Sequence, residues 1–191
     1  MKRQIFTGLR LLGIMIILTG IIYPGLITLV TTLFFNDKAQ GSLIEQNGVL
    51  IGSRLIGQNF ESPEYFWSRP SVNSYDPLNS GGSNLGISNP LLKDKLIQRK
   101  QKFLKANNIE NDLYIPSEMI TASASGLDPH ISPAAALLQA DRIADARGMN
   151  HEKRDQLIKI INDLTEKRQF SLLGEPHINV FLLNLKIDSL R

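Results

Sequence analysis

The hydrophobic positions of the chain form one long run close to the N-terminus. Residues 11–36 contain no charged side chain, and fifteen of residues 11–35 are Leu, Ile, Val or Phe. At about 1.5 Å per residue, a helix of this length exceeds the roughly 30 Å hydrocarbon core of a bilayer, so it can span with some tilt. A cleaved signal peptide has a shorter apolar stretch that ends in a small-residue cleavage site, and the run has neither feature. The pattern predicts a retained transmembrane helix over residues 11–35, kinked at Pro24.

The charged residues on either side of this run indicate its orientation. Residues 1–10 hold three cations and no acid, whereas residues 37–53 carry one lysine against two acidic side chains. Because segments that stay in the cytoplasm hold the excess of Lys and Arg, residues 1–10 are expected to be cytoplasmic. Residues 36–191 then form an extracytoplasmic domain, which is periplasmic if the cell has a periplasm.

Beyond the span, the pattern changes between the period of strands and that of helices. A polar linker over residues 37–48 is followed by a short strand over residues 49–56. Three helices are predicted, each preceded by an Asn or Ser that can cap its first turn, over residues 90–107, 133–147 and from 151 onward. A final strand is predicted over residues 178–187. Separated strands with helices between them predict the α+β class and a single domain of about 150 residues.

The segment before the first of these helices, residues 57–90, is longer than an ordinary loop. It is rich in Ser, Asn, Gly and Pro, which is typical either of disorder or of a functional surface. Disordered segments are poor in aromatic residues. We therefore expect the loop to be packed, because it carries Phe60, Tyr65, Phe66, Trp67 and Tyr75.

Composition narrows the possible function classes. The chain has no cysteine, which excludes thiol catalysis, cysteine-based zinc sites and disulfide frameworks. The formal net charge is +3, and the three cations of residues 1–10 account for all of it. A nucleic-acid-binding protein needs its cations clustered on a folded face, so no nucleic-acid partner is expected.

One Gly-rich motif has the composition of a binding loop. Residues 79–86 read NSGGSNLG, and the backbone amides of such a turn can form an anion-binding concavity. The run holds no lysine, lacks the GxxxxGK[ST] spacing and does not follow a strand. On spacing alone, a tight turn is the favoured interpretation.

A second motif gathers polar groups that could carry chemistry. Residues 123–132 read SASGLDPHIS, and Asp128, His130 and a serine could form a nucleophilic triad. The chain would then be an independent membrane-anchored hydrolase or ligand-binding domain. Groups this close along one chain seldom reach the geometry of a triad, and no GxSxG elbow is present. A rigid turn, with Ser132 capping the following helix, is the favoured interpretation.

The other candidate polar residues carry weaker signals. His151 and His177 have no metal-ligand spacing with His130, so no metal site is expected. Gln139 and Arg142 are three residues apart and share one face of their helix. A Gln amide can pair with an adenine edge, although solvation at the surface is the commoner role for both residue types.

In chain order, five segments resemble the C subunit of the Kdp-type potassium-transporting ATPase. With the short cytoplasmic start and the single span they cover nearly the whole chain: GSRLIGQNF (52–60), YFWSRPS (65–71), SGGSNLG (80–86), SGLDPHISPAAALLQADRIADARG (125–148) and GEPHINVFLLNL (174–185). The SGLDPHISP block is highly specific for this family.

The resemblance implies an inner-membrane complex with lipid around the span and two protein partners. One partner is a channel-like subunit that conducts potassium, and the other is a P-type subunit that hydrolyses ATP. The C subunit itself is not catalytic. It is needed for assembly and activity, and it has been described as a catalytic chaperone that raises the ATP affinity of the pump through a ternary complex with nucleotide.

The resemblance also assigns candidate residues. The SGGS segment is similar to a nucleotide-contacting signature, and Gln139 would contact the base, so the implied ATP-binding residues are Ser80, Gly81, Gly82, Ser83 and Gln139. The family motifs further mark a surface with Arg69, Asp128, His130 and Arg142. The expected topology favours other roles, because an exported domain cannot readily reach cytoplasmic nucleotide. A place over the external mouth of the potassium pathway, or coupling through the span, fits that topology.

Two positions depart from the family pattern. Ala124 stands where Gly is expected, and alanine restricts positive φ, which questions a glycine-dependent turn at that point. His177 stands where Arg is usual, so an electrostatic contact made there would depend on pH.

Overall fold

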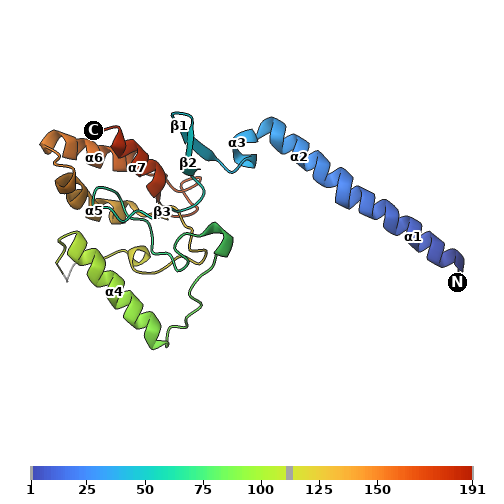
Figure 1. Ribbon diagram of the computed structural model, residues 1–191, viewed down its shortest axis with the longest axis horizontal. Coiled ribbons are helices and arrows are strands. Elements are labelled where there is room, and N and C mark those ends of the chain that lie inside the picture. Colours follow the sequence, from blue (N-terminus) through green and yellow to red (C-terminus); the bar gives the residue numbers. More distant parts are fainter. Residues whose placement is uncertain (1, 111–113, 191) are drawn as a thin grey trace. The chain divides into compact units, whose positions relative to one another are not determined.

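The computed structural model describes residues 2–110 and 114–190 (Figure 1). The chain divides into two compact units, Met1–Ser53 and Arg54–Arg191. The second unit contains every segment of the two candidate motifs.

The first unit begins with one long apolar helix. It consists of α1 (Lys2–Ile17), a π-helical turn (Leu18–Ile22) and α2 (Tyr23–Phe34), and none of its described side chains is buried. Its most apolar window has a mean hydropathy of 2.2, so the helix is long and apolar enough to cross a membrane. The π-helical turn ends two residues before Pro24, whose missing N–H interrupts ordinary α-helical hydrogen bonding. The helix runs without a break over Lys2–Phe34, and Figure 1 shows α1 and α2 as one continuous helix.

The expected linker over residues 37–48 is wrong, because most of it has regular structure. A short helix, α3 (Asn36–Ala39), precedes an antiparallel hairpin of β1 (Leu43–Gln46) and β2 (Val49–Ser53). The turn between the strands is Asn47-Gly48, with φ of 53° and 76°. Asn-Gly favours such left-handed turns, so the hairpin had a recognisable signal in the sequence. The predicted strand over residues 49–56 is confirmed as far as Ser53.

The second unit is an assembly of helices and one small sheet, so the α+β class is confirmed. Its regular elements, in chain order, are a 3₁₀ turn (Pro77–Asn79), α4 (Pro90–Ala106), a second 3₁₀ turn (Ser117–Met119), β3 (His130–Ile131), α5 (Pro133–Ala146), α6 (His151–Asp163), β4 (Ile178–Asn179) and α7 (Val180–Asp188). Strands β3 and β4 pair antiparallel, with His130 opposite Asn179. Helix α5 packs on α6, α6 packs on α7, and α4 packs on the second 3₁₀ turn.

The three predicted helix starts are confirmed by their capping hydrogen bonds. Asn89 Oδ1 accepts from the Leu91 amide at 3.0 Å, and Asn150 Oδ1 accepts from the Lys153 amide at 2.9 Å. Ser132 Oγ accepts from the Ala135 amide at 3.1 Å. Each bond satisfies an N–H of the first turn that has no partner within its helix, which fixes where the helix begins.

The predicted strand over residues 178–187 is wrong. Only Ile178–Asn179 pairs as a strand, and α7 follows directly. Asn179 Oδ1 caps that helix by accepting from the Leu182 amide at 3.1 Å. The buried positions Val180, Leu183 and Ile187 have helical spacing, which the apolar residues between them obscured.

The core of the second unit includes the long loop. Phe66 is fully buried together with Ile143, Leu157 and Leu183. Phe60, Tyr65 and Trp67 pack against the same cluster. The predicted packing of the loop is therefore confirmed for its aromatic segment, whereas Leu78 and Ile87 in its later part are exposed.

Candidate functional site

The aromatic part of the loop has no strand beside it, so buried side chains satisfy its backbone. Gln139 is fully buried, and its Oε1 accepts from the Trp67 amide at 2.8 Å. Its Nε2 donates to the carbonyl oxygens of Trp67 and Ala135 at 3.4 and 3.3 Å. From α7, Asn184 makes the same pair of bonds to Phe66, at 2.8 and 3.0 Å. Buried backbone groups need such partners, so these amides fix the loop in place.

Arg142 completes this arrangement from the next turn of α5. Its guanidinium donates to the carbonyl oxygens of Pro63 and Tyr65 at 2.6 and 3.0 Å, to Asn107 Oδ1 at 2.9 Å and to Gln139 Oε1 at 2.8 Å. It also lies 4.5 Å from the centre of the Trp67 ring. No carboxylate pairs with it among the described residues, and burial lowers its pKa to about 10.

The surface role expected for Gln139 and Arg142 is therefore wrong. Both side chains lie in the interior, where they hold the loop to α5. The predicted contact of Gln139 with an adenine edge would require the amide to leave these bonds.

The SGLDPHISP motif forms a turn organised by one carboxylate. Asp128 Oδ2 accepts from Arg69 Nη1 at 2.7 Å, and Oδ1 accepts from the His130 amide at 3.0 Å. The His130 ring lies 3.5 Å from the same carboxylate. Burial raises the pKa of Asp128, but the hydrogen bonds from His130 and Arg69 outweigh it and lower the pKa to about 2. Asp128 therefore joins the long loop to the motif as a charged group.

Two glycines let other segments approach this turn closely. A Cβ on Gly57 would lie 2.7 Å from the Asp128 carbonyl oxygen, and a Cβ on Gly126 would lie 2.4 Å from Asn73 Oδ1. Gly126 also has a φ of 70°, which only glycine adopts readily. Ala124 is not among the positive-φ residues, so its departure from the family pattern is accommodated.

The SGGS segment runs along the same turn. The Gly81 amide and the Ser80 hydroxyl both donate to the Ser125 carbonyl oxygen, at 2.9 and 3.0 Å. A Cβ on Gly82 would lie 3.2 Å from the Ala124 carbonyl oxygen. The Gly81 amide is thus already used within the chain. A role of Ser80–Ser83 in nucleotide binding stays a prediction.

The two histidines at the small sheet lie against each other. The rings of His130 and His177 meet edge to face with their centres 4.6 Å apart. His177 Nε2 lies 3.7 Å from a carboxylate oxygen of Glu166. No group of three metal-ligating side chains is found in residues 2–110 and 114–190. The ring of His130 contacts Asp128 and His177, and among the described residues no serine hydroxyl contacts it to complete a triad.

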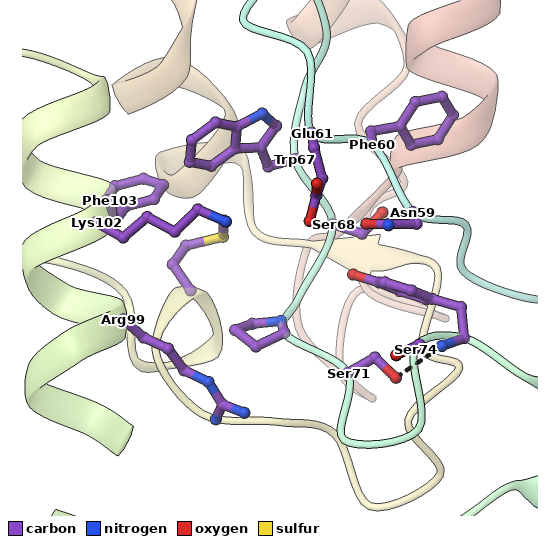
Figure 2. A pocket seen from close by; sticks show the side chains of 13 residues that line it. Asn59, Phe60, Glu61, Trp67, Ser68, Ser71, Ser74, Arg99, Lys102 and Phe103 are labelled. Atoms are coloured by element: carbon purple, nitrogen blue, oxygen red, sulfur yellow. Dashed lines mark hydrogen bonds between the residues drawn. The ribbon is translucent and has the colours of Figure 1, made fainter. Parts of the chain in front are cut away.

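A cavity of about 250 Å³ lies between α4 and residues 59–75 of the loop (Figure 2). Its walls include Trp67, Tyr75 and Phe103, and its charged lining residues are Glu61, Arg99 and Lys102. Figure 2 shows Arg99 and Lys102 extending from α4 toward the loop. Burial raises the pKa of Tyr75 to about 12, and the Tyr75 hydroxyl donates to the Arg69 carbonyl oxygen at 2.5 Å.

Sequence reasoning missed this cavity, although α4 carries a signal for it. The helix holds six Lys or Arg residues against one acid, Asp94. The overall balance of charge concealed this cluster, because acidic residues elsewhere in the domain compensate it. A charge count along each predicted helix could have found it.

Known proteins match this chain over nearly its whole length. A family model described as "K+-transporting ATPase, c chain" matches residues 5–189. The potassium-transporting ATPase KdpC subunit of Koribacter versatilis is 46% identical over 190 residues, covering 98% of this chain and 95% of that protein. The KdpC subunit of Herpetosiphon aurantiacus is 47% identical over 178 residues, covering 92% and 90%. That of Polynucleobacter asymbioticus is 44% identical over 191 residues, covering 98% and 99%.

Proposed function

The chain belongs to the family of the K+-transporting ATPase c chain, and from that membership we propose that it is the non-catalytic, single-span subunit of an ATP-driven potassium uptake complex. The observation that carries the proposal is the extent of the match. It begins inside the apolar helix and ends one residue after α7, so the family shares the anchor and the folded domain together.

The span and its flanking charges support a defined topology. The helix over Lys2–Phe34 is consistent with a single-pass membrane protein. The three cations of residues 1–10 favour a cytoplasmic N-terminus and an extracytoplasmic domain. In a cell with two membranes, this subunit lies in the inner membrane with its domain in the periplasm.

A structural role for the SGLDPHISP motif supports the non-catalytic assignment. The carboxylate of Asp128 is engaged by Arg69 and by the His130 amide, and these bonds join segments that are distant in sequence. A nucleophilic triad would instead need an aligned hydroxyl and a base. Of the triad that an independent hydrolase would need, the described residues bring together only Asp128 and the His130 ring, without a serine hydroxyl.

The proposed partners are a potassium-conducting subunit and an ATP-hydrolysing subunit, and the chain supports their assembly and activity. We propose that the chain affects ATP hydrolysis indirectly, from a position remote from the nucleotide. Coupling through the span, or a position over the external mouth of the potassium pathway, raises the ATP affinity of the pump without direct contact with nucleotide. The burial of Gln139 and the use of the Gly81 amide within the chain support this arrangement.

Co-purification tests the proposal. When the chain is expressed with its two partner subunits and one partner carries an affinity tag, all three should elute from detergent in a constant ratio. A version in which residues 2–34 are replaced by an unrelated single span tests whether the helix itself contributes to assembly. Elution of the tagged partner complex without the chain, under conditions where the chain is expressed and folded, would overturn the assignment.

A further inference from the structure

The cavity between α4 and the 59–75 loop contains a cation at a position where helical spacing calls for an apolar residue. Leu92, Leu96 and Phe103 follow helical spacing along one face of α4, and Arg99 stands on the same face. Its guanidinium is partly desolvated, which lowers its pKa. Among the described residues, its one hydrogen bond runs from Nη1 to the Ile120 carbonyl oxygen at 3.3 Å, and no carboxylate pairs with it. Charged side chains at positions where the helical pattern calls for an apolar residue are concentrated at functional sites.

A second cation lines the same cavity. Lys102, one turn further along α4, holds its ammonium 5.5 Å from the centre of the Trp67 ring. Neither Arg99 nor Lys102 has a carboxylate partner among the described residues. The lining thus holds two cations against the single carboxylate of Glu61, and an excess of positive charge attracts an anionic ligand.

The remaining lining residues limit what kind of anion fits. Glu61 supplies an acceptor for a hydroxyl group of the ligand, while Trp67, Phe103 and Met119 form apolar walls. A volume of about 250 Å³ is smaller than the roughly 300–1,000 Å³ of pockets that hold drug-sized molecules. The cavity therefore suits a phosphoester with a small hydroxyl-bearing substituent better than a whole nucleotide.

The anchor indicates where such a phosphoester comes from. Residues 35–53 join the apolar helix to the domain, and even a fully extended chain of that length reaches only about 65 Å. The domain is therefore tethered to the bilayer, and this length of chain sets the greatest distance between them. Each Lys or Arg close to an anionic membrane surface contributes favourably to the free energy of binding to that surface. The cationic helix α4 would therefore be attracted to anionic lipid.

We propose that this cavity binds the glycerophosphate headgroup of an anionic membrane phospholipid, with Arg99 and Lys102 on the phosphate, Glu61 on the headgroup hydroxyls and Trp67 as a wall. The site depends on the membrane anchor and not on the transport activity. It can be tested on the full chain without its partners.

Trp67 provides the measurement, because it is the single tryptophan of the chain and lines the cavity. The full chain in nonionic detergent micelles is titrated with phosphatidylglycerol, and separately with phosphatidylcholine, inorganic phosphate and ATP. Emission of Trp67 and its quenching by acrylamide, a neutral quencher, are followed. We expect phosphatidylglycerol alone to give a saturable emission change with reduced quenching.

A matched pair of variants separates the cavity from general attraction to α4. Arg99→Gln with Lys102→Gln removes two cations from the cavity, and Lys100→Gln with Lys105→Gln removes two from the same helix outside it. The first pair should weaken the phosphatidylglycerol response about tenfold or more, as the loss of two charge-assisted contacts implies. The second pair should leave the response close to wild type. Circular dichroism and thermal unfolding establish that each variant is folded.

Three results would overturn the proposal. An equal loss in both double variants would mean that the lipid responds to the charge of α4 and not to the cavity. A matching response to inorganic phosphate or ATP at the same or lower concentration would assign the site to a soluble phosphate. If the wild-type chain is folded and its Trp67 emission and quenching do not change with phosphatidylglycerol, the cavity does not bind this headgroup.

Discussion

Arg142 donates from Nη2 to the side-chain oxygen of Gln139 at 2.8 Å, one turn apart on α5, and both side chains lie in the interior. The same Gln139 oxygen accepts from the Trp67 amide. One amide oxygen thus links a buried cation to the backbone of the long loop. This small network decides where the aromatic segment of the loop lies, and with it the wall of the cavity.

Replacing Gln139 with Leu should therefore destabilise the domain. The substitution keeps the size of the side chain but leaves the Trp67 amide and an Arg142 donor unpaired in the interior, which costs about 2–3 kcal/mol. Urea unfolding followed by Trp67 fluorescence measures the loss. Leu137→Gln, at an exposed position of the same helix, is the control and should change stability by less than about 0.5 kcal/mol. Equal stability of Gln139→Leu and wild type would show that the network does not support the loop.

Asp128 should make the stability of the domain depend on acid pH. Its pKa in the folded protein is about 2, below the usual 3.8. The folded state therefore favours the carboxylate, and its contribution is complete above about pH 4 and disappears as the pH falls toward 2. We expect Asp128→Asn to lower the unfolding free energy at pH 7 by about 1–2 kcal/mol.

The pH series distinguishes this effect from simple loss of packing. The difference between wild type and Asp128→Asn should narrow between about pH 4 and pH 2, as the wild-type carboxylate is protonated. Asp94→Asn, at an exposed position of α4, controls for the removal of a negative charge. A difference that stays constant down to pH 2 would rule out the ionised Asp128 as its source.

Gly126 should tolerate no side chain. Alanine at this position needs an unfavourable positive φ and places its Cβ 2.4 Å from Asn73 Oδ1, so Gly126→Ala should cost at least about 2 kcal/mol. Gly86→Ala is a matched control, because Gly86 has open space around it and no positive φ. Thermal unfolding of the two variants compares them directly. If both variants unfold at the wild-type temperature, Gly126 does not lie as close to Asn73 as described.

Local signals in the sequence predicted the helices of the second unit well. Asn89, Ser132 and Asn150 each precede an apolar stripe, and a cap of this kind acts within one turn. The same reasoning failed at Asn179, because the apolar run that follows it fits a strand and a helix equally well. The hairpin at Asn47-Gly48 was predictable from its turn and was missed.

The candidate site was less predictable, because its contacts join distant parts of the chain. Gln139 and Arg142 have the spacing of surface residues, and only the loop more than 70 residues earlier makes them interior groups. Arg99 likewise reads as one more cation of a basic helix. Its position facing a cavity depends on how residues 59–75 fold back onto α4.

The absence of cysteine makes the topology directly testable. A membrane-impermeant maleimide should label the full chain carrying Ile87→Cys in intact spheroplasts, since residue 87 is fully exposed in the domain. Gln4→Cys, before the span, should react only after the cells are broken open. The reverse pattern would place the domain in the cytoplasm and would contradict the orientation inferred from the cations of residues 1–10.

Potassium-stimulated ATP hydrolysis by the purified complex tests the central claim most directly. The assay compares the partner subunits alone, the partners with this chain, and this chain alone. The account predicts that the chain alone hydrolyses no ATP and that its omission lowers the stimulated rate by at least about tenfold, which corresponds to roughly 1.4 kcal/mol of barrier. A complex that retains its full rate without the chain, or a chain that hydrolyses ATP by itself, would contradict it.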